Sequence, residues 1–532
     1  MTAFIIITKL LHVHIEHKLD NLQLSQLIVT IGAGHDPTKA CLSGTRTTVL
    51  KDIRTWIHGG KGTDSRLLLL IGQAGVGKSA IAHSIATEYS KLGRLASTFF
   101  CSKDRDSSNF FRTIARNMAD VNPLYGSLLL SESITNEMAT SPFAAIQMES
   151  VLLVPFKNLS ILGPLVIVID ALDECANAEE IVDCLVQNIN NFPTNIRFLV
   201  TSRPSEARAL AEYSWVSVHD LEREPEAATD DDILRYVMHR LRDHISGQKL
   251  GDLSPLDLDL IVASSEKLFQ YAAVVCTEML SAFKFRSRES PRQTFDRLVK
   301  GNKPGLDALY TGILDFLHPS NSELQVFQHV MGLILVAGQR LTHAALVDLG
   351  TCLRDPSTQE PGYDSVSRTL RPLGALFSGT QDPQAFVYPL HSSFRNYLLD
   401  ETRSKRFYIG TETSQHASMT AVSLRLMVQK LHFNMVGLKS SYVLNNEVPH
   451  FQNQVDAAIP QSLSYACIHW AIHLRLSLEN DAAFESSNDL DVLMTQKFLF
   501  WLEALGLLKQ VGTALTACQF LLILSAVSSL VK

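Results

Sequence analysis

The chain has 532 residues, of which 46% are hydrophobic and 19% are charged, and its formal net charge is −7 at pH 7. This length accommodates three or four domains, each with a core of its own. Lysine and arginine are scattered and form no basic run, so the charge pattern argues against a nucleic-acid partner. The eight cysteines form no C-x-x-C pair, and Cys175 and Cys184 have no matching histidines for zinc, which predicts reduced, packed thiols in the cytoplasm.

Residues 1–38 are predicted to form an N-terminal arm. Its apolar patch is interrupted by Lys9, His12, His14 and Glu16, far short of the roughly 20 apolar residues that a membrane span needs. The basic residues follow the apolar part instead of preceding it, and no cleavage site comes after it, which argues against a secretory signal.

A glycine-rich stretch at 72–79, GQAGVGKS, directly follows the apolar run Leu67–Ile71. It fits the pattern G-x-x-x-x-G-K-[ST], in which backbone N–H groups surround phosphate oxygens, the lysine neutralises them and the hydroxyl reaches a magnesium ion. A strand before it and a helix after it favour this over an ordinary glycine-rich turn. The predicted nucleotide-binding residues are Gly72, Gly75, Val76, Gly77, Lys78, Ser79 and Ala80, with Ser79 also a magnesium ligand.

A second apolar run, at 165–169, ends in Asp170. Five apolar residues predict a fully buried parallel strand, and open α/β sheets place their ligands at the carboxyl ends of such strands. Asp170 is therefore the second predicted magnesium ligand. Asp173 and Glu174 follow after a small residue, and we predict that they polarise or hold an attacking water as catalytic acids. The alternative is that both acids only start the next helix.

A third run, at 196–200, ends in Thr201, Ser202 and Arg203. A guanidinium at the end of a strand next to the Asp170 strand suits contact with a terminal phosphate, so Arg203 is a predicted nucleotide-binding residue. An exposed structural arginine before a proline is the alternative. Further strand-like runs at 96–101 and 215–218 complete a predicted parallel sheet with helices between the strands, in three layers.

The pattern changes after this α/β region. The acidic stretch at 222–226 and the residues 229–232 predict a linker that ends in a helix cap. Amphipathic patterns then predict helices, among them 313–317, 327–335 and 342–349. The predicted domains are an arm at 1–38, a P-loop NTPase core at 39–220, a helical bundle at 221–305, a winged-helix-like domain at 306–402 and an all-α region at 403–532. The winged helix lacks the cations of a DNA-recognition helix, which favours a packing role.

The last segment, Val511–Val531, is uncharged and long enough for a membrane helix. Its glycine, threonines, glutamine and serines make it only moderately apolar, so we expect a buried helix and consider a membrane anchor the less favoured alternative. No repeat with a solenoid or propeller period is evident, so a repeat sensor is missing from this sequence.

The order GQAGVGKS, VIVIDALDE and RFLVTSRP resembles the NACHT branch of the signal-transducing ATPases with numerous domains (STAND), which includes the NOD-like receptors of innate immunity. More narrowly, four segments resemble the fungal NACHT proteins related to heterokaryon-incompatibility NTPases: CLSGTRTTVLKDIRTWI, LHSSFRNYLLD, YACIHWAIHL and FLFWLEALGLLK. The similarity runs from about residue 35 to about residue 509. Relatives usually continue into a repeat array, so the resemblance implies a truncated chain.

The resemblance implies a signalling switch that binds Mg²⁺ with ATP or ADP, is closed with diphosphate, and self-associates with triphosphate when a sensor is engaged. GTP is also possible, and the effector protein is not identified. In such proteins a winged-helix histidine contacts the nucleotide, and His391 stands at the matching place; a core or helix-cap histidine is the alternative. The usual Gly-x-Pro motif that touches the base is replaced by KLFQYA at 267–272, which puts base recognition in doubt.

Two other functions remain open at this point. The chain could be a turnover ATPase of helicase-like or chaperone-like type, although a helicase would add basic and aromatic strand-binding surface that this sequence lacks. It could also be a scaffold that binds nucleotide without hydrolysing it. The switch is favoured, with a role in fungal non-self recognition or programmed cell death, no nucleic-acid partner and no membrane partner.

Overall fold

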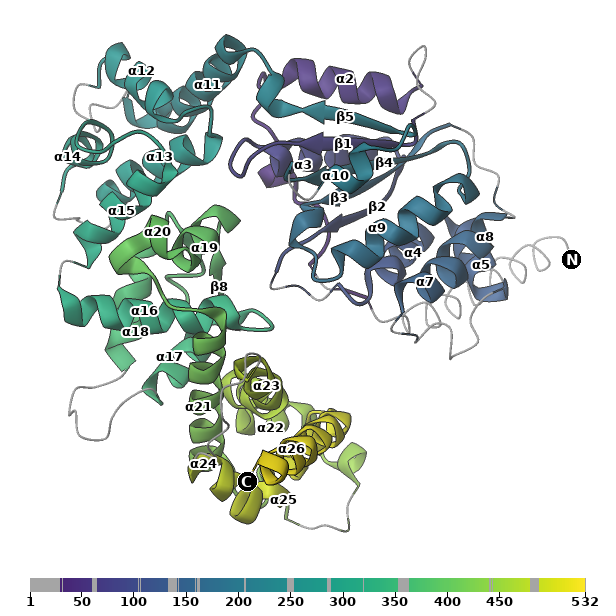
Figure 1. The fold of residues 1–532 in the computed structure, drawn as a ribbon, viewed down its shortest axis with the longest axis vertical. Helices are drawn as coiled ribbons and strands as arrows, with labels where there is room; N and C mark the ends of the chain where they lie inside the picture. Colours follow the sequence, from purple (N-terminus) through teal and green to yellow (C-terminus); the bar gives the residue numbers. More distant parts are fainter. Residues whose placement is uncertain are drawn as a thin grey trace, which may run out of the picture. The chain divides into compact units, whose positions relative to one another are not determined.

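The computed structural model describes residues 29–531 apart from 31, 60–64, 104, 106, 133–140, 142, 158, 160–162, 205–206, 246–252, 285–288, 319, 353–362, 440–441, 443 and 479–487. Most of the predicted arm, residues 1–28, lies outside the described residues. The chain divides into two compact units, one that ends at Cys276 and one that begins at Thr277 (Figure 1). This division falls inside helix α13 (Phe269–Lys284), so the finer domain boundaries stay predictions.

The first unit is built on a five-stranded sheet in the order β2-β3-β4-β1-β5, and every neighbouring pair is parallel. Its strands are β1 (Leu67–Ile71), β2 (Leu95–Phe100), β3 (Leu165–Asp170), β4 (Ile196–Ser202) and β5 (Val216–Asp220). The five predicted strand runs and the α/β fold class are therefore confirmed. β1 lies between β4 and β5, and β3 lies between β2 and β4, so the phosphate loop and Asp170 emerge on either side of β4 at one edge of the sheet.

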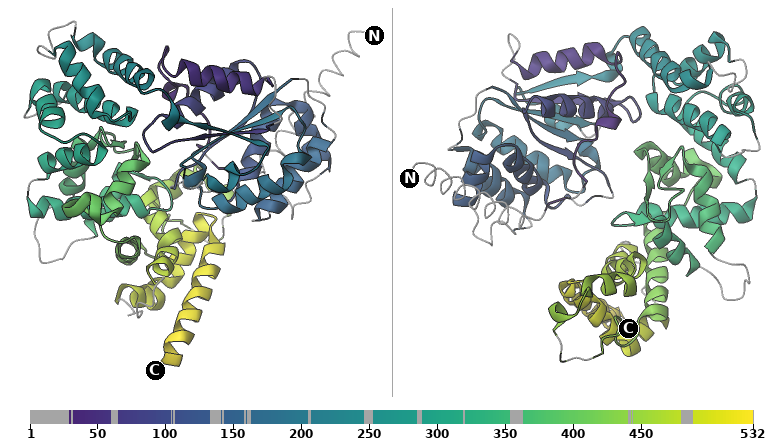
Figure 2. Two further views of the ribbon diagram at one scale, coloured as in Figure 1. Left: turned by 45° about the horizontal axis from the view of Figure 1, so that its top comes forward. Right: turned by 180° about the vertical axis from the view of Figure 1, so that it is seen from behind.

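Helices cover both faces of this sheet, because successive side chains of each strand point to opposite faces. Leu67, Leu69 and Ile167 pack in one apolar core, whereas Leu68 and Leu70 pack in the other. The two helical layers are visible when the front and back views are compared (Figures 1 and 2). On the first face lie α4 (Phe110–Val121), α5 (Pro123–Glu132), α7 (Ala144–Gln147), α8 (Val154–Lys157) and α9 (Ala178–Asn188), and on the second lie α2 (Thr47–Ile57) and α3 (Lys78–Lys91).

Helices follow the sheet in the first unit. They are α11 (Glu226–Ile245), α12 (Pro255–Ser264) and the start of α13, whereas α10 (Arg208–Ala211) lies between β4 and β5. The predicted linker is wrong in its second half, because α11 begins at Glu226 and residues 229–232 lie inside it. A run of good helix formers, Glu226-Ala227-Ala228, extends the helix toward the sheet. As a result Asp232 is a helical side chain and not a cap.

The second unit is mainly helical and contains a three-stranded antiparallel sheet in the order β6-β8-β7. Helices cover the predicted runs at 313–317 and 327–335, and the run at 342–349 from His343 onward. The elements are α14 (Pro291–Phe295), α15 (Leu306–Leu317), α16 (Asn321–Val336), β6 (Leu341–Thr342), α17 (His343–Thr351), α18 (Tyr363–Leu370), β7 (Phe377–Ser378), β8 (Phe386–Pro389), α19 (Ser392–Leu399) and α20 (Glu401–Ser404).

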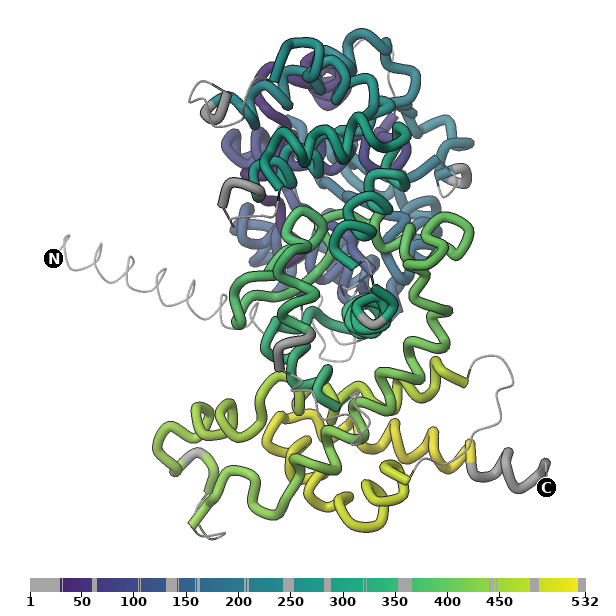
Figure 3. The backbone as a smooth tube through the Cα atoms, turned by 90° about the vertical axis from the view of Figure 1, so that its left-hand side faces the viewer, coloured from purple at the N-terminus to yellow at the C-terminus, as the bar shows by residue number. Residues whose placement is uncertain are grey.

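A bundle of helices ends the second unit (Figure 3). It consists of α21 (Glu412–Lys430), α22 (Phe451–Ala458), α23 (Gln461–Ser477), α24 (Asn488–Val492), α25 (Phe498–Leu507) and α26 (Val511–Val531). The expected burial of α26 is wrong for its described side chains: Ala514 and Ala517 are buried, whereas Leu515, Leu522 and Ile523 are exposed. Among the side chains described in α26, the two buried ones are three residues apart and so lie on one side of the helix. Within the described part of the chain, no helix combines the length and the apolar character that a membrane crossing requires.

The prediction of eight reduced cysteines is wrong for two of them. Cys101 and Cys175 form a disulfide with their Cα atoms 5.4 Å apart. Cys101 directly follows β2, and Cys175 comes soon after β3, so the pairing of these two parallel strands brings both cysteines to one edge of the sheet. The two cysteines are 74 residues apart in the sequence, so rules that rely on short spacings between cysteines do not detect the pair.

The sheet makes a stability prediction with a matched control. Val168 in β3 is 0% exposed, whereas Val218 in the edge strand β5 is 44% exposed. Val168→Ala should lower the free energy of unfolding by about 1.5–3 kcal/mol, because it removes two buried methyl groups. Val218→Ala should change it by no more than about 0.5 kcal/mol. Urea unfolding of the full chain measures both, and equal shifts would contradict the burial of β3.

Candidate nucleotide-binding site

The phosphate loop joins β1 to α3 through a backbone that only glycine adopts easily. Gly75 has φ +92° and Gly77 has φ +100°, in the left-handed region. Gly77 caps α3, which begins at Lys78, and Ser79 and Ala80 follow on its first turn. A Cβ on Gly72 would lie 3.0 Å from Cγ2 of the buried Val76 and 3.3 Å from Cβ of Leu221, so the loop is tightly packed there. The predicted loop residues thus form one turn at the N-terminus of a helix, which is a general anion-binding geometry.

Lys78 is the cation that the loop holds in place. Its Nζ donates to the carbonyl oxygens of Gly72 at 2.6 Å and Gln73 at 2.9 Å. Burial lowers the pKa of Lys78, and the nearby carboxylates of Asp173 and Asp170 oppose this shift. The Lys78 ammonium is therefore close enough to Asp170 and Asp173 for their charges to raise its pKa.

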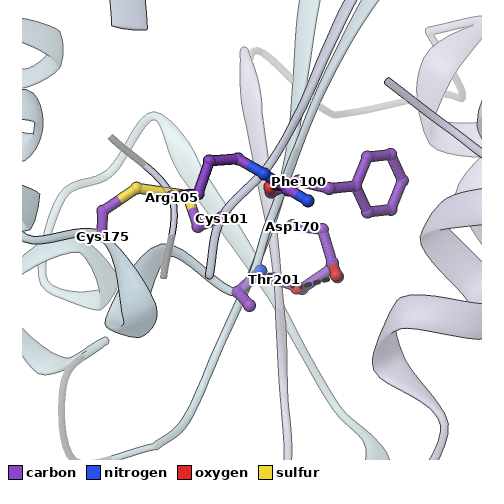
Figure 4. Close-up of a disulfide and its surroundings, with 7 residues drawn as sticks. Phe100, Cys101, Arg105, Asp170, Cys175 and Thr201 are labelled. Carbon is purple, nitrogen blue, oxygen red and sulfur yellow. Dashed lines mark hydrogen bonds between the residues drawn. A yellow bond between two sulfur atoms is a disulfide. The ribbon is translucent and has the colours of Figure 1, made fainter. Parts of the chain in front are cut away.

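Asp170 ends the central strand β3 and is 4% exposed. Thr201 donates from Oγ1 to its Oδ1 at 2.6 Å (Figure 4), and the Ser79 hydroxyl lies close enough to the carboxylate to lower its pKa. Burial raises the pKa of Asp170, whereas Thr201, Ser79 and Lys78 lower it. The two predicted magnesium ligands, Ser79 and Asp170, are therefore neighbours, as a shared ion requires.

The chain turns sharply after Asp170. Ala171 has φ +54°, a left-handed conformation that is uncommon for any residue but glycine, and its N–H donates to Thr201 Oγ1 at 2.8 Å. A 3₁₀ turn, η3 (Leu172–Glu174), carries the two predicted catalytic acids; we call residues 171–175 the acid turn. Helix α9 begins only at Ala178, so the acids do not start it.

Arg203 follows β4 and meets both acids. Its Nε lies 3.0 Å from Asp173 Oδ2, its backbone N–H donates to Asp173 Oδ1 at 3.2 Å, and its Nη2 lies 3.6 Å from Glu174 Oε1. The side chain of Asp173 is 5% exposed and that of Glu174 is 16% exposed. Asp173 is thus tied to Arg203 at two points, whereas Glu174 makes the longer contact. The structure brings all three predicted residues together, with the acids next to the arginine.

Three contacts from outside the motifs also hold the phosphate loop. Arg46 is buried and donates from Nη2 to Val76 O at 2.8 Å, and the Gln270 N–H donates to Gly75 O at 3.2 Å. Glu222 Oε1 accepts from the Gln73 N–H at 3.1 Å.

Sequence reasoning missed these three residues because they depend on tertiary packing. The sequence analysis singled out the segments that contain them without assigning a role at the loop: Arg46 lies in CLSGTRTTVLKDIRTWI, Glu222 in the acidic stretch at 222–226 and Gln270 in KLFQYA.

His391 lies in the second unit, where it is the N-cap of α19. Its Nδ1 accepts from the Ser393 N–H at 3.1 Å and lies 2.7 Å from Ser393 Oγ. Because Nδ1 accepts a hydrogen bond, the ring proton is assigned to Nε2. His391 is therefore a helix-cap histidine, as the alternative interpretation expected. Its contact with nucleotide stays a prediction.

The arrangement fits a hard cation held mainly by nucleotide and water. Among the residues that the structure describes, no three His, Cys, Asp or Glu side chains form a metal cage of their own. The site instead offers the Ser79 hydroxyl and the Asp170 carboxylate. Mg²⁺ favours this type of site, because it keeps several waters and takes one or two carboxylates together with substrate phosphates.

Comparisons with known proteins find similarity over the residues that form this site. The family model of the N-terminal region of nephrocystin 3 matches residues 44–203, which contain all three motifs. The vegetative incompatibility protein HET-E-1 of Podospora anserina is 23% identical over 528 residues, which cover 91% of this chain and 37% of that protein. The chain thus spans well under half the length of this relative.

Two solved structures show weaker likeness. A STAND protein with a tetratricopeptide repeat sensor from Pyrococcus horikoshii is 12% identical at a TM-score of 0.38, covering 91% of this chain and 64% of that one. The Orc1 protein of Aeropyrum pernix, solved with DNA, is 11% identical at a TM-score of 0.28, covering 68% and 92%. No conclusion rests on either of them.

Lys78→Ala tests the phosphate loop. The substitution leaves phosphate charge uncompensated in a partly desolvated site, so ATP and ADP affinity should fall by roughly 2–4 kcal/mol. Lys91→Ala is the matched control, because Lys91 ends the same helix and is exposed. Calorimetric titration measures both variants. Unchanged affinity in Lys78→Ala, or an equal loss in Lys91→Ala, would rule out the phosphate-binding role.

Proposed function

Because the chain is related to the NACHT/STAND NTPases of the HET incompatibility type, we propose that it is a nucleotide-dependent signalling switch. It binds ATP or ADP with Mg²⁺ at the phosphate loop and hydrolyses the triphosphate slowly, and the nucleotide state controls domain packing and self-association. The observation that carries the proposal is the meeting of Lys78, the Ser79–Asp170 pair and the Arg203–acid cluster at one edge of the sheet. A preference between ATP and GTP is left open.

For the hydrolysis step, the geometry favours Glu174 over Asp173 as the residue that positions water. Two contacts from Arg203 hold Asp173, at 3.0 and 3.2 Å, whereas the ion pair between Arg203 and Glu174 is longer, at 3.6 Å, and the Glu174 side chain is more exposed. A carboxylate that orients the attacking water acts only if it can reach the nucleophile. Asp173 then serves as a positioning residue that holds Arg203 near the terminal phosphate.

The change between nucleotide states can reach other parts of the chain, because the phosphate loop is hydrogen-bonded to segments that follow the sheet. Gln270 at the start of α13 and Glu222 before α11 both contact loop backbone atoms. A change in loop conformation between diphosphate and triphosphate would alter these contacts, and only such a difference can bias an equilibrium between states. We propose that His391 adds a second bias by donating from Nε2 to bound diphosphate.

The name of a relative supports the biological setting that we propose. HET-E-1 is a vegetative incompatibility protein, which supports a role for this chain in fungal non-self recognition or programmed cell death. Because the chain spans 37% of that relative, the activity and partners of the relative as a whole are proposals here. We expect a cytoplasmic location, self-association on activation and an effector protein whose identity is open.

Glu174→Gln tests the hydrolytic role. Nucleotide binding should persist, and steady-state turnover should fall by roughly 10²-fold, as for the loss of a general base. Glu179→Gln is the matched control, because Glu179 is an exposed glutamate in the first turn of α9. If Glu174→Gln, Asp173→Asn and the parent chain all turn over equally, the non-hydrolysing scaffold is the better account. Turnover of about 1 per second or more that DNA or RNA stimulates would favour a helicase-like enzyme.

His391→Leu tests the switch. Loss of a charge-assisted hydrogen bond of about 1.5–3 kcal/mol should weaken diphosphate binding more than triphosphate binding, and should promote self-association. The measurement is the ratio of the two affinities together with the oligomeric state.

His391 also caps α19, and the loss of a cap alone costs about 0.5–2 kcal/mol of stability. His391→Asn separates the two roles, because asparagine is a good cap that cannot replace the imidazole at a phosphate. The proposal predicts that both variants bind diphosphate more weakly relative to triphosphate than the parent chain does. A normal ratio in either variant would leave only the capping role.

A further inference from the structure

The disulfide lies beside the acid turn (Figure 4). Cys175 is the last residue of that turn, directly after Glu174, and Cys101 directly follows the edge strand β2. The two cysteines are 8% and 7% exposed and belong to the same apolar core as the strands. The bond therefore joins a rigid strand end to the turn that carries both predicted catalytic acids.

The turn is anchored at its start without any help from the disulfide. The Ala171 N–H donates to Thr201 Oγ1 at 2.8 Å, and the Glu174 N–H donates back to Ala171 O at 2.8 Å. Arg203 holds the acid side chains in the middle of the turn. At the far end, the Cys175 N–H donates to Leu172 O within the turn, and Cys175 O accepts from the Ala178 N–H at 3.3 Å, which ties this end to α9 and not to the sheet. The link from Cys175 to Cys101 is thus the covalent anchor of the far end to the sheet.

The partner cysteine is itself well fixed. The Cys101 N–H donates to Asp170 O at 2.9 Å, which continues the pairing of β2 with β3. Cys101 is consequently held on the strand that carries the predicted magnesium ligand. A bond from this point restrains Glu174 relative to Asp170, and relative position within a site sets how well a carboxylate can orient water.

We propose that Cys101 and Cys175 are a redox-sensitive pair that controls the order of the acid turn and, through Glu174, the rate of nucleotide hydrolysis. The hydrolysis part rests on the proposed function, whereas the effect on the turn does not. In the reduced state both thiols still pack as small apolar side chains, so the core persists while the far end of the turn is released.

The oxidant that we propose is a low-molecular-weight disulfide of the glutathione type. One protein thiolate attacks a sulfur of the small disulfide, which breaks its S–S bond, forms a mixed disulfide and releases one small thiol. The second protein thiolate then attacks the protein sulfur of the mixed disulfide and releases the second small thiol. Two electrons pass from the cysteine pair to the small disulfide, and the two protons of the cysteines end on the two released thiols.

The test equilibrates the full chain in buffers with different ratios of reduced to oxidised glutathione. Alkylation and peptide mass mapping report the pairing, hydrogen exchange reports the order of residues 171–175, and a steady-state assay reports hydrolysis. We expect oxidation to pair Cys101 with Cys175 and to slow exchange in the acid turn. Reduction should lower hydrolysis by between about threefold and 10²-fold, since small displacements of catalytic groups have effects of this size.

Cys184→Ser is the matched control, because Cys184 is a buried free cysteine of the same unit, in α9. It should keep the full redox response, whereas the double variant Cys101→Ser, Cys175→Ser should lose it. The response of the parent chain needs no substitution, so a poorly folded variant does not remove the test.

Several outcomes overturn the proposal. One is that both cysteines stay open to alkylation in every buffer, and another is that pairing leaves exchange of the acid turn unchanged. A third is that hydrolysis responds equally in the double serine variant. If the chain hydrolyses no nucleotide in any state, the proposed function fails, and a redox effect on exchange in the turn would still stand apart from that failure.

Discussion

The buried carboxylate of Asp170 is the constraint on which the site depends. A carboxylate with so little exposure is costly unless hydrogen bonds and an opposite charge compensate it. Its compensation comes from three residues in two segments: Thr201 in β4, and Lys78 and Ser79 at the start of α3. All three reach it only because β4 lies between β1 and β3 in the sheet. The compensation of the buried carboxylate therefore depends on the order of the strands in the sheet.

The same hydrogen-bond arrangement shapes the acid turn. Thr201 Oγ1 donates to Asp170 and accepts from the Ala171 N–H, so a single hydroxyl fixes both the carboxylate and the left-handed residue after it. Arg203, two residues beyond Thr201, then holds Asp173 and lies near Glu174. The end of β4 thus positions the acids after β3. Of the two acids, Glu174 has the more exposed side chain.

Local sequence patterns predicted the sheet and the three motifs because each depends on consecutive residues. Apolar runs mark buried strands, and the spacing of the glycines between Gly72 and Ser79 is enough to predict the conformation of the loop. The patterns failed where distant residues meet. Arg46 and Gln270 reach the loop across 30 and 195 positions of the chain, and Cys101 meets Cys175 through strand pairing. The exposed side of α26 was also missed, because apolar content alone does not tell how wide a buried stripe is.

The central claim is that Ser79 and Asp170 share a magnesium ion with bound nucleotide phosphates. Its most direct test is a calorimetric titration of ATP into the parent chain and into Asp170→Asn, each with Mg²⁺ and with a chelator. Asparagine keeps the shape and can still accept from Thr201, but it brings no charge to a cation. The account predicts that Mg²⁺ strengthens binding to the parent chain and has little effect on the variant, which keeps its metal-free affinity. An equal magnesium effect on both proteins, or no binding to the parent chain, would contradict it.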